Sequence, residues 1–257
     1  MIKNEFSDYR IAINGCRSYG CGFSRLKRCR GKLPWIWTVL AMGLGLGLVV
    51  VAAGHSRLAH HRIVVIAIDP GHGGRDPGAV SHGLQEKNIT LAIAKDLAKL
   101  IDRHDGLRAV LTRHNDHYVG LLRRVAIARQ AGAQLFISIH ADAGKPSWDW
   151  ATVYTQEHDL TALASDRLAD KITASLRRIE RTDRDRQANF VVLRDSHVPA
   201  VLIETGYITN AHQAHQLASA CFQHHLAQAV FRGIESYLSH PYPGKPPPAS
   251  PFTAAAK

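Results

Sequence analysis

The stretch from Ile63 to Gly74 reads IVVIAIDPGHGG, and it decides the class of fold. Its first six residues are apolar and mostly β-branched, a pattern typical of a strand that is buried on both faces of a parallel sheet. A proline and three glycines then end the strand sharply. His72 and Asp69 stand at this break. The strand therefore delivers two polar side chains to one edge of the predicted sheet.

Strand and helix patterns alternate along the rest of the chain. Apolar residues at helical spacing predict helices, and short apolar runs predict strands. The predicted helices span 86–104, 121–131, 160–179 and 211–238, the last of which can be divided into two pieces. Further strands are predicted at 108–112, 135–139, 152–155, 190–193 and 200–203. This alternation predicts an α/β domain with a largely parallel sheet and helices on both faces.

The net charge of +11 is concentrated near the N-terminus. Eight basic and two acidic residues precede Pro34, which leaves about +6 of the charge in that flank. Residues 33–54 contain no charged residue, and about 20 apolar residues are enough to cross a bilayer. Basic residues before such a segment predict that the N-terminus stays in the cytoplasm. The charge is thus explained by topology, and we expect no nucleic-acid partner.

The chain is predicted to divide into five parts. They are a basic cytoplasmic flank (1–32), a transmembrane anchor or signal segment (33–54), a linker (55–62), a catalytic domain (63–240) and a disordered tail rich in Pro and Ala (241–257). The length of the apolar segment favours an uncleaved anchor, although Val51 to Ala53 could be read by a signal peptidase. Either alternative places the domain in the periplasm or elsewhere outside the cytoplasm. The four cysteines indicate no disulfide framework.

Three of the predicted strands lead into polar residues at their carboxyl ends, where open α/β sheets bind ligands. These residues are His72, His140 and Glu204, and Glu86 opens a helix that can return to the same edge. Two histidines and one carboxylate form a catalytic zinc site when a fourth position stays open for water. A second carboxylate can accept a proton from that water. The histidine pairs of the C-terminal helical region are a weaker alternative metal site.

Several motifs occur in an order and spacing that resemble one known family. They are Ile68–Gly74, Glu86–Asn88, Thr112-Arg113 with Asp116 and Arg124, Ser138–Asp142, Asn189–Arg194 and Pro199–Asn210. Over about residues 63 to 238, the chain resembles the zinc-dependent N-acetylmuramoyl-L-alanine amidases of the bacterial cell wall, the amidase-3 family.

The resemblance implies a six-stranded mixed sheet flanked by helices. It also implies a hydrolase that cleaves peptidoglycan between N-acetylmuramic acid and the L-alanine of the stem peptide. His72, Glu86 and His140 would bind Zn²⁺, and Glu204 would be the catalytic glutamate. Another zinc amidohydrolase or deacetylase, or a peptidase acting on cell-wall material, remains an alternative. A non-catalytic wall-binding module is disfavoured because all four residues are present.

Five further residues are candidates for supporting roles. Asp69 and Asp142 are expected either to orient the ligand imidazoles or to cap the turns that follow them. Arg113 and Arg124 are expected either to meet carboxylates of the substrate or to form structural ion pairs. Asn189 is expected to line the substrate groove.

Two features depart from the family pattern or from some of its members. The segment 143–150 carries two tryptophans in the sequence KPSWDW. The segment 142–189 is too short for the long inserted helix by which a partner protein regulates some members. An activating protein partner is therefore in doubt, and the membrane segment is expected to provide localisation.

Overall fold

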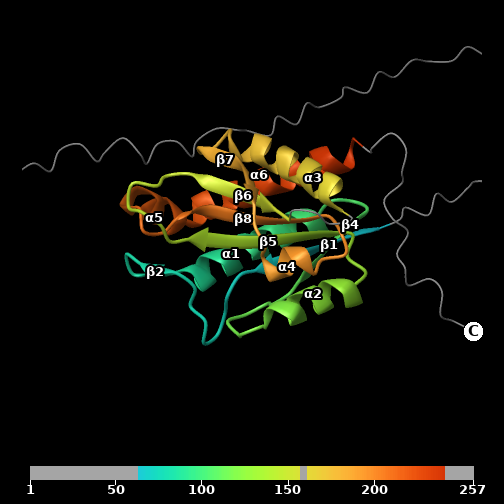
Figure 1. Cartoon of the computed structure of the whole chain (residues 1–257), viewed down its shortest axis with the longest axis horizontal. Coiled ribbons are helices and arrows are strands. Elements are labelled where there is room, and N and C mark those ends of the chain that lie inside the picture. The colour runs from blue at the N-terminus through green and yellow to red at the C-terminus, as the bar shows by residue number, and fades with distance from the viewer. Residues whose placement is uncertain (1–62, 157–160, 241–257) are drawn as a thin grey trace, which may run out of the picture. The chain divides into compact units, whose positions relative to one another are not determined.

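The computed structural model describes residues 63–156 and 161–240, in which a six-stranded sheet lies between two layers of helices (Figure 1). The strands of this sheet are β1 (Val64–Pro70), β4 (Leu107–Leu111), β5 (Leu135–Asp142), β6 (Ala151–Thr155), β7 (Thr182–Gln187) and β8 (Ala200–Tyr207). A short hairpin pairs β2 (Val80–Ser81) with β3 (Leu84–Gln85). The helices are α1 (Glu86–Asp102), α2 (Leu121–Gln130), α3 (Ala162–Leu176), α4 (Val191–Arg194), α5 (Ala211–Leu217) and α6 (Ala220–Leu238).

The strands follow the order β4-β1-β5-β8-β6-β7. Neighbouring strands are parallel except for β6 and β8, which run antiparallel. The predicted six-stranded, mostly parallel mixed sheet flanked by helices is therefore confirmed. The predicted membrane segment at 33–54 lies outside the described residues. Within 63–156 and 161–240, no helix combines the length and the apolar character needed to cross a membrane.

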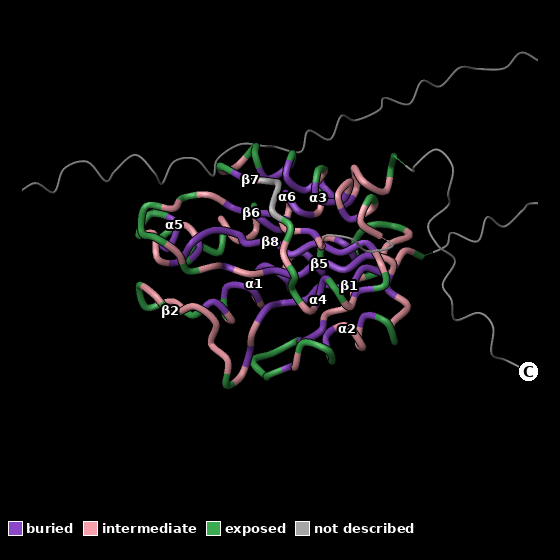
Figure 2. The backbone as a smooth tube through the Cα atoms, in the orientation of Figure 1, coloured by how far each residue is buried: buried purple, intermediate pink, exposed green. Residues whose placement is uncertain are grey.

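The central strands are buried on both faces, as Figure 2 shows, and all eight residues of β8 are buried. One face packs against α1, α3 and α6 in the larger of the two apolar clusters. The other face packs against α2 and α4 in a smaller cluster, which includes Val65, Phe136 and Leu202. The polar residues on the face of the sheet that packs against α2 and α4 form the site described below.

One predicted strand is wrong, and one strand of the six-stranded sheet was not predicted; the short strands β2 and β3 were not predicted either. Val191–Arg194 forms the short helix α4 instead of a strand, because a run of four apolar residues is too short to separate the two periodicities. The sixth strand is β7, whose sequence TDRDRQ has no apolar run. It lies at the edge of the sheet and pairs only with β6, a position that tolerates polar residues.

Two leucines at helical spacing, one in α2 and one in α3, are exposed instead of facing the core. Leu122 in α2 and Leu163 in α3 are 65% and 77% exposed. In α2 the inward position is taken by Arg124, which lies two residues after Leu122 and therefore on the opposite side of the helix. The buried face of α2 thus carries a positive charge, which needs a negatively charged partner in the sheet.

Candidate metal centre and active site

The sheet changes from apolar to polar along its strands on the face that α2 and α4 cover. Alternate residues of a strand share a face, so Phe136, Ser138 and His140 form one row in β5. In β8, Leu202 is followed on the same face by Glu204. Phe136 and Leu202 belong to the apolar cluster beneath α2 and α4. The polar end of this face, at the carboxyl ends of β5 and β8, is the location of the candidate site.

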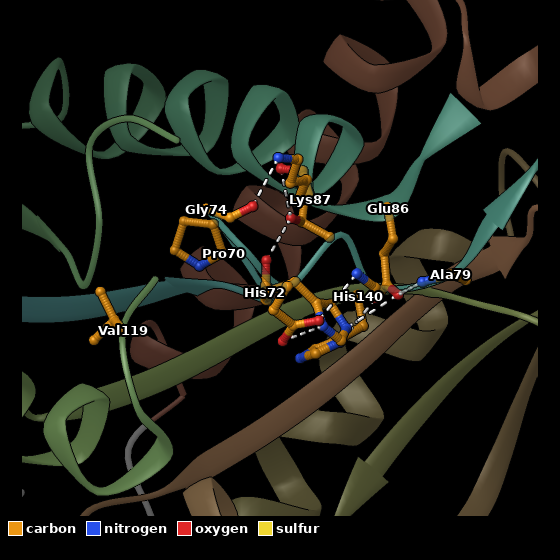
Figure 3. A network of polar contacts seen from close by, with 12 residues as sticks. Pro70, His72, Gly74, Ala79, Glu86, Lys87, Val119 and His140 are labelled. Carbon is orange, nitrogen blue, oxygen red and sulfur yellow. Dashed lines mark hydrogen bonds and ion pairs between the residues drawn. The ribbon is translucent and has the colours of Figure 1, made fainter. Parts of the chain in front are cut away.

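Three side chains from different elements converge there. His72 follows β1, Glu86 is the first residue of α1, and His140 lies in β5. His72 Nε2 is 3.0 Å from Glu86 Oε2, and His140 Nδ1 is 2.9 Å from Glu86 Oε1. Figure 3 shows both imidazoles directed at this one carboxylate. Their ligand atoms all lie within 4.8 Å of one another, and no second group of three such residues occurs in the described part of the chain.

The donor set fits a zinc ion. Imidazole nitrogen and carboxylate oxygen are zinc ligands, and three of them leave a coordination position open. The side chains of His72 and His140 are 24% and 19% exposed, so the site can be reached from solvent. The structure therefore brings together all three residues that were predicted to bind zinc.

Glu86 is held as a carboxylate. Its two oxygens accept backbone N–H groups from Ala79 at 2.9 Å and Ala141 at 3.0 Å. Burial alone would raise the pKa of Glu86, but hydrogen bonds and charges from His140 and His72 lower it well below its usual range. A negative charge fixed between two imidazoles prepares this position for a cation.

Asp76 orients His72, a role that the sequence analysis did not find. Its Oδ2 is 2.9 Å from His72 Nδ1, which leaves Nε2 facing Glu86. Burial would lower the pKa of His72, yet its contacts with Glu86 and Asp76 raise it. Carboxylates commonly fix the tautomer of a ligand histidine in this way. The one signal in the sequence is an acidic residue four positions after His72, inside a glycine-rich turn.

Glu204 lies beside this group. It is opposite His140 in the pairing of β5 with β8, and opposite Thr152 in the pairing of β6 with β8. The residue is only 7% exposed, and within the described part of the chain its Oε2 is buried without a hydrogen-bond partner. Burial raises the pKa of Glu204 well above its ordinary value, and the charges of Glu86 and Asp142 raise it further. A carboxyl with a raised pKa and a free oxygen is suited to exchanging a proton.

Asp69 and the two predicted arginines form a buried structural network. Asp69 accepts hydrogen bonds from Thr112, Arg124 and Ser138, so the contacts of its carboxylate are with these groups and not with a histidine ring. Arg124 also donates to the carbonyls of Pro70 and His72, at 2.6 and 2.7 Å.

Arg113 is fully buried and supports the same loop. It donates to the carbonyls of Pro70 at 2.9 Å and of Gly71 and Lys87 at 2.8 Å. Burial and the neighbouring charge of Arg124 lower the pKa of Arg113 to about 10. Of the two roles expected for the arginines, the structure displays the internal one, in which they hold the backbone that carries His72.

Asp142 and Asn189 lie outside the three-residue group. Asp142 ends β5 and accepts the backbone N–H of Ala143 at 2.7 Å, which is a turn-capping contact. Burial raises the pKa of Asp142, and the charge of Glu86 adds to this effect. Asn189 is exposed in the segment between β7 and α4.

Comparison with known proteins assigns the family. The family model described as N-acetylmuramoyl-L-alanine amidase matches residues 66–236, which include the whole three-residue group and Glu204. The chain belongs to the N-acetylmuramoyl-L-alanine amidase family. AmiA of Escherichia coli K12 is 33% identical to this amidase over 220 residues, which cover 68% of this chain and 76% of AmiA. YqiI of Bacillus subtilis is 37% identical over 205 residues and is covered over 97% of its length.

Other members differ in length, and their folds agree with this one. The match covers 52% of the probable amidase AmiB of Haemophilus influenzae, so the chain spans about half of that relative. Among solved structures, the amidase AmiC2 of Nostoc punctiforme superposes with a TM-score of 0.64 at 37% identity. That superposition covers 69% of this chain and 98% of AmiC2. The shared region is therefore the amidase domain itself.

Proposed function

We propose that this amidase hydrolyses the amide bond between N-acetylmuramic acid and L-alanine in peptidoglycan, with a zinc ion held by His72, Glu86 and His140. One observation carries the proposal. The three donor groups converge within 4.8 Å beside Glu204, whose buried carboxyl has an unpartnered oxygen. A zinc ligand set next to a proton-exchanging carboxyl can activate water and protonate a leaving amine, which are the two tasks in hydrolysis of an unactivated amide.

A bound zinc ion would supply a Lewis acid and would lower the pKa of water to about 7. Glu204 takes a proton from the water that attacks the carbonyl of the lactyl group. As the carbon–nitrogen bond breaks, Glu204 returns this proton to the amine of L-alanine, which leaves with its nitrogen neutral. Asp76 and the arginine network keep His72 in position throughout, because they hold its ring and its backbone.

The substrate lies outside the cytoplasmic membrane, so the function requires export. Residues 33–54 would act as an anchor or as a signal segment, after the basic flank 1–32 and before the linker 55–62. The catalytic domain 63–240 would then work in the periplasm or an equivalent space, followed by the tail 241–257. The CwlD amidase of Clostridioides difficile has been solved in complex with the GerS lipoprotein. We propose no protein activator for this amidase.

Another zinc amidohydrolase, a deacetylase or a peptidase would use a similar ligand set, and only the products separate these activities. The test is digestion of purified peptidoglycan by the full chain, with and without a chelator, followed by mass analysis. We expect peptides that begin with L-alanine and glycan strands with free lactyl groups, formed only when zinc is present. Deacetylated glycan with intact stems, or peptides cut internally, would contradict the proposal.

A further inference from the structure

Two aromatic rings of the loop after β5 pack against each other and against a third ring at the end of β8. The ring centroids of Trp148 and Trp150 are 5.5 Å apart, and those of Trp148 and Tyr207 are 5.1 Å apart. The ring of Tyr207 is also 5.6 Å from Trp150. Tyr207 is buried, whereas both tryptophans are partly exposed. We call Trp148, Trp150 and Tyr207 the aromatic cluster.

The cluster lies next to the candidate active site. Tyr207 is three residues after Glu204 in β8 and pairs with Asp142 at the end of β5. Trp150 directly precedes β6, and Thr152 of that strand is opposite Glu204. β6 runs antiparallel to β8, so its start lies beside the end of β8. The aromatic cluster therefore continues the sheet edge beyond Glu204.

The loop that carries the tryptophans is held in one conformation. Gly144 donates to and accepts from the hydroxyl of Thr209, both at 2.9 Å, and Asn210 donates to the carbonyl of Pro146 at 2.7 Å. A Cβ at Gly144 would lie 2.4 Å from the ring of Trp148, so the backbone approaches this ring closely. The exposed ring surface is thus preorganised, which reduces the entropy cost of binding.

Polar groups surround the aromatic cluster. The guanidinium of Arg181 lies 5.3 Å from the ring centroid of Trp150 and pairs with Asp149 at 3.1 Å. Lys145 is exposed in the same loop. The indole Nε1 of Trp150 is buried without a hydrogen-bond partner among the described residues. An aromatic surface with hydrogen-bonding groups at its border suits a ligand that has an apolar face and polar edges.

We propose that the aromatic cluster binds an N-acetylhexosamine ring of the glycan strand. This inference rests on the proposed function, in which such sugars flank the scissile bond. A pyranose ring presents C–H groups on its faces, which contact the negative faces of aromatic rings, and hydroxyl groups at its edges. The stem peptide is a poorer occupant of these ring faces, because the negative faces of aromatic rings repel its carboxylates.

The test is a binding titration that requires no turnover. In the full chain, Trp35→Phe and Trp37→Phe leave Trp148 and Trp150 as the remaining two of the four tryptophans. Chitotetraose, a peptide-free tetramer of N-acetylglucosamine, should change their fluorescence in a saturable way. Trp148→Leu should weaken this binding roughly three- to tenfold, and Trp148→Phe should retain most of it.

Tyr237→Leu is the matched control. Tyr237 is another aromatic residue that lies near an arginine, Arg167, but it lies in α6 and packs against the larger apolar cluster, which includes none of the three residues of the aromatic cluster. Here the parent is the chain that carries only Trp35→Phe and Trp37→Phe. In that background, Tyr237→Leu should bind chitotetraose with the same affinity as the parent. On peptidoglycan, Trp148→Leu should raise KM and leave kcat nearly unchanged, a split that a merely structural role would not produce.

The titration of the parent chain decides the proposal even if Trp148→Leu does not fold. No saturable response to chitotetraose, or a response only to the free stem peptide, would overturn it. Equal affinity in parent and Trp148→Leu would do the same. Because the sugar titration needs no catalysis, a chain that binds chitotetraose but releases no peptide would refute the proposed function and leave the sugar site intact.

Discussion

His72 adopts a left-handed backbone conformation, with φ at 59°, which residues other than glycine rarely adopt. Arg124 holds its carbonyl and Asp76 holds its ring, so the surrounding loop stabilises this conformation. Two glycines make room for His140 and Glu86. A Cβ at Gly71 would lie 2.4 Å from the His140 ring, and one at Gly78 would lie 2.4 Å from Glu86 Oε2. The site therefore depends on the lack of a side chain at Gly71 and Gly78 as much as on the polar side chains themselves.

Gly71→Ala tests this dependence. The added methyl group should push the His140 ring out of place and weaken zinc binding about 10- to 100-fold, as displacement of a supporting contact typically does. Zinc affinity measured by competition with a chromophoric chelator checks the prediction. Gly120→Ala is the control, because a Cβ at Gly120 meets nothing within 4 Å. Unchanged affinity in Gly71→Ala would show that the ring position is not critical.

Glu204→Gln tests the proton-exchanging group. The amide retains the size of the side chain but cannot take a proton from water, so turnover on purified peptidoglycan should fall about 10²- to 10⁴-fold. Zinc content measured by elemental analysis should stay at one ion per chain, because Glu204 is not among the proposed ligands. Undiminished turnover with normal zinc content would remove Glu204 from the mechanism.

At the scale of elements, the position of the site is determined by the point along each strand at which apolar residues are followed by polar ones. That change occurs at Asp69 in β1, which meets Arg124 from α2 at 2.8 Å in a pair whose side chains are at most 3% exposed. The ion pair joins β1, α2 and the loop that carries His72. This network adds to the apolar packing of α2, whose inward face also carries the buried Ala128.

Asp69→Asn should destabilise the fold by about 3 kcal/mol, because it leaves the charge of Arg124 buried without compensation. Denaturant unfolding of the metal-free chain measures the effect apart from zinc binding. Asp195→Asn is the matched control, since the Asp195–Arg194 pair is on the surface and should contribute less than about 1 kcal/mol. Equal losses in both variants would refute the role given to the buried pair.

The sequence predicts the elements well where their periodicity is long, as in α1 and β1, and poorly where it is short or missing. In the six-stranded sheet, the strand prediction is wrong at Val191–Arg194, which is helical, and it misses β7. The convergence of His72, Glu86 and His140 follows from the rule that strand ends share an edge. Asp76 could not be predicted as a partner of His72, because no periodicity determines the path of the loop between them. The pairing of Asp69 with Arg124 spans 55 residues and depends on how α2 docks.

For the whole molecule, one buried group outside the site is expected to make its own contribution to the pH dependence of stability. Both carboxylate oxygens of Glu180, which follows α3, are buried without a hydrogen-bond partner among the residues that the structure describes. Burial raises the pKa of this carboxyl from 4.5 to about 8. The folded chain thus retains a proton that the unfolded chain releases. The stability that Glu180 contributes should be fully present below pH 4.5 and should be lost as the pH rises toward 8.

Glu180→Gln should remove most of this loss and stabilise the protein at pH 8.5 by on the order of 2 kcal/mol, with little change near pH 4. Unfolding curves at several pH values give the comparison. Glu235→Gln is the control, because the side chain of Glu235 is 38% exposed and carries no comparable burial penalty. The same pH dependence in Glu180→Gln and the parent chain would contradict this assignment.

The central claim is that His72, Glu86 and His140 together hold one zinc ion. Anomalous diffraction at the zinc absorption edge, from crystals of the chain grown with one equivalent of zinc, tests it most directly. We predict a single strong peak between these three side chains, with an open side toward Glu204. A peak on other histidines, such as His212 and His215, with none between the three residues, would contradict the account.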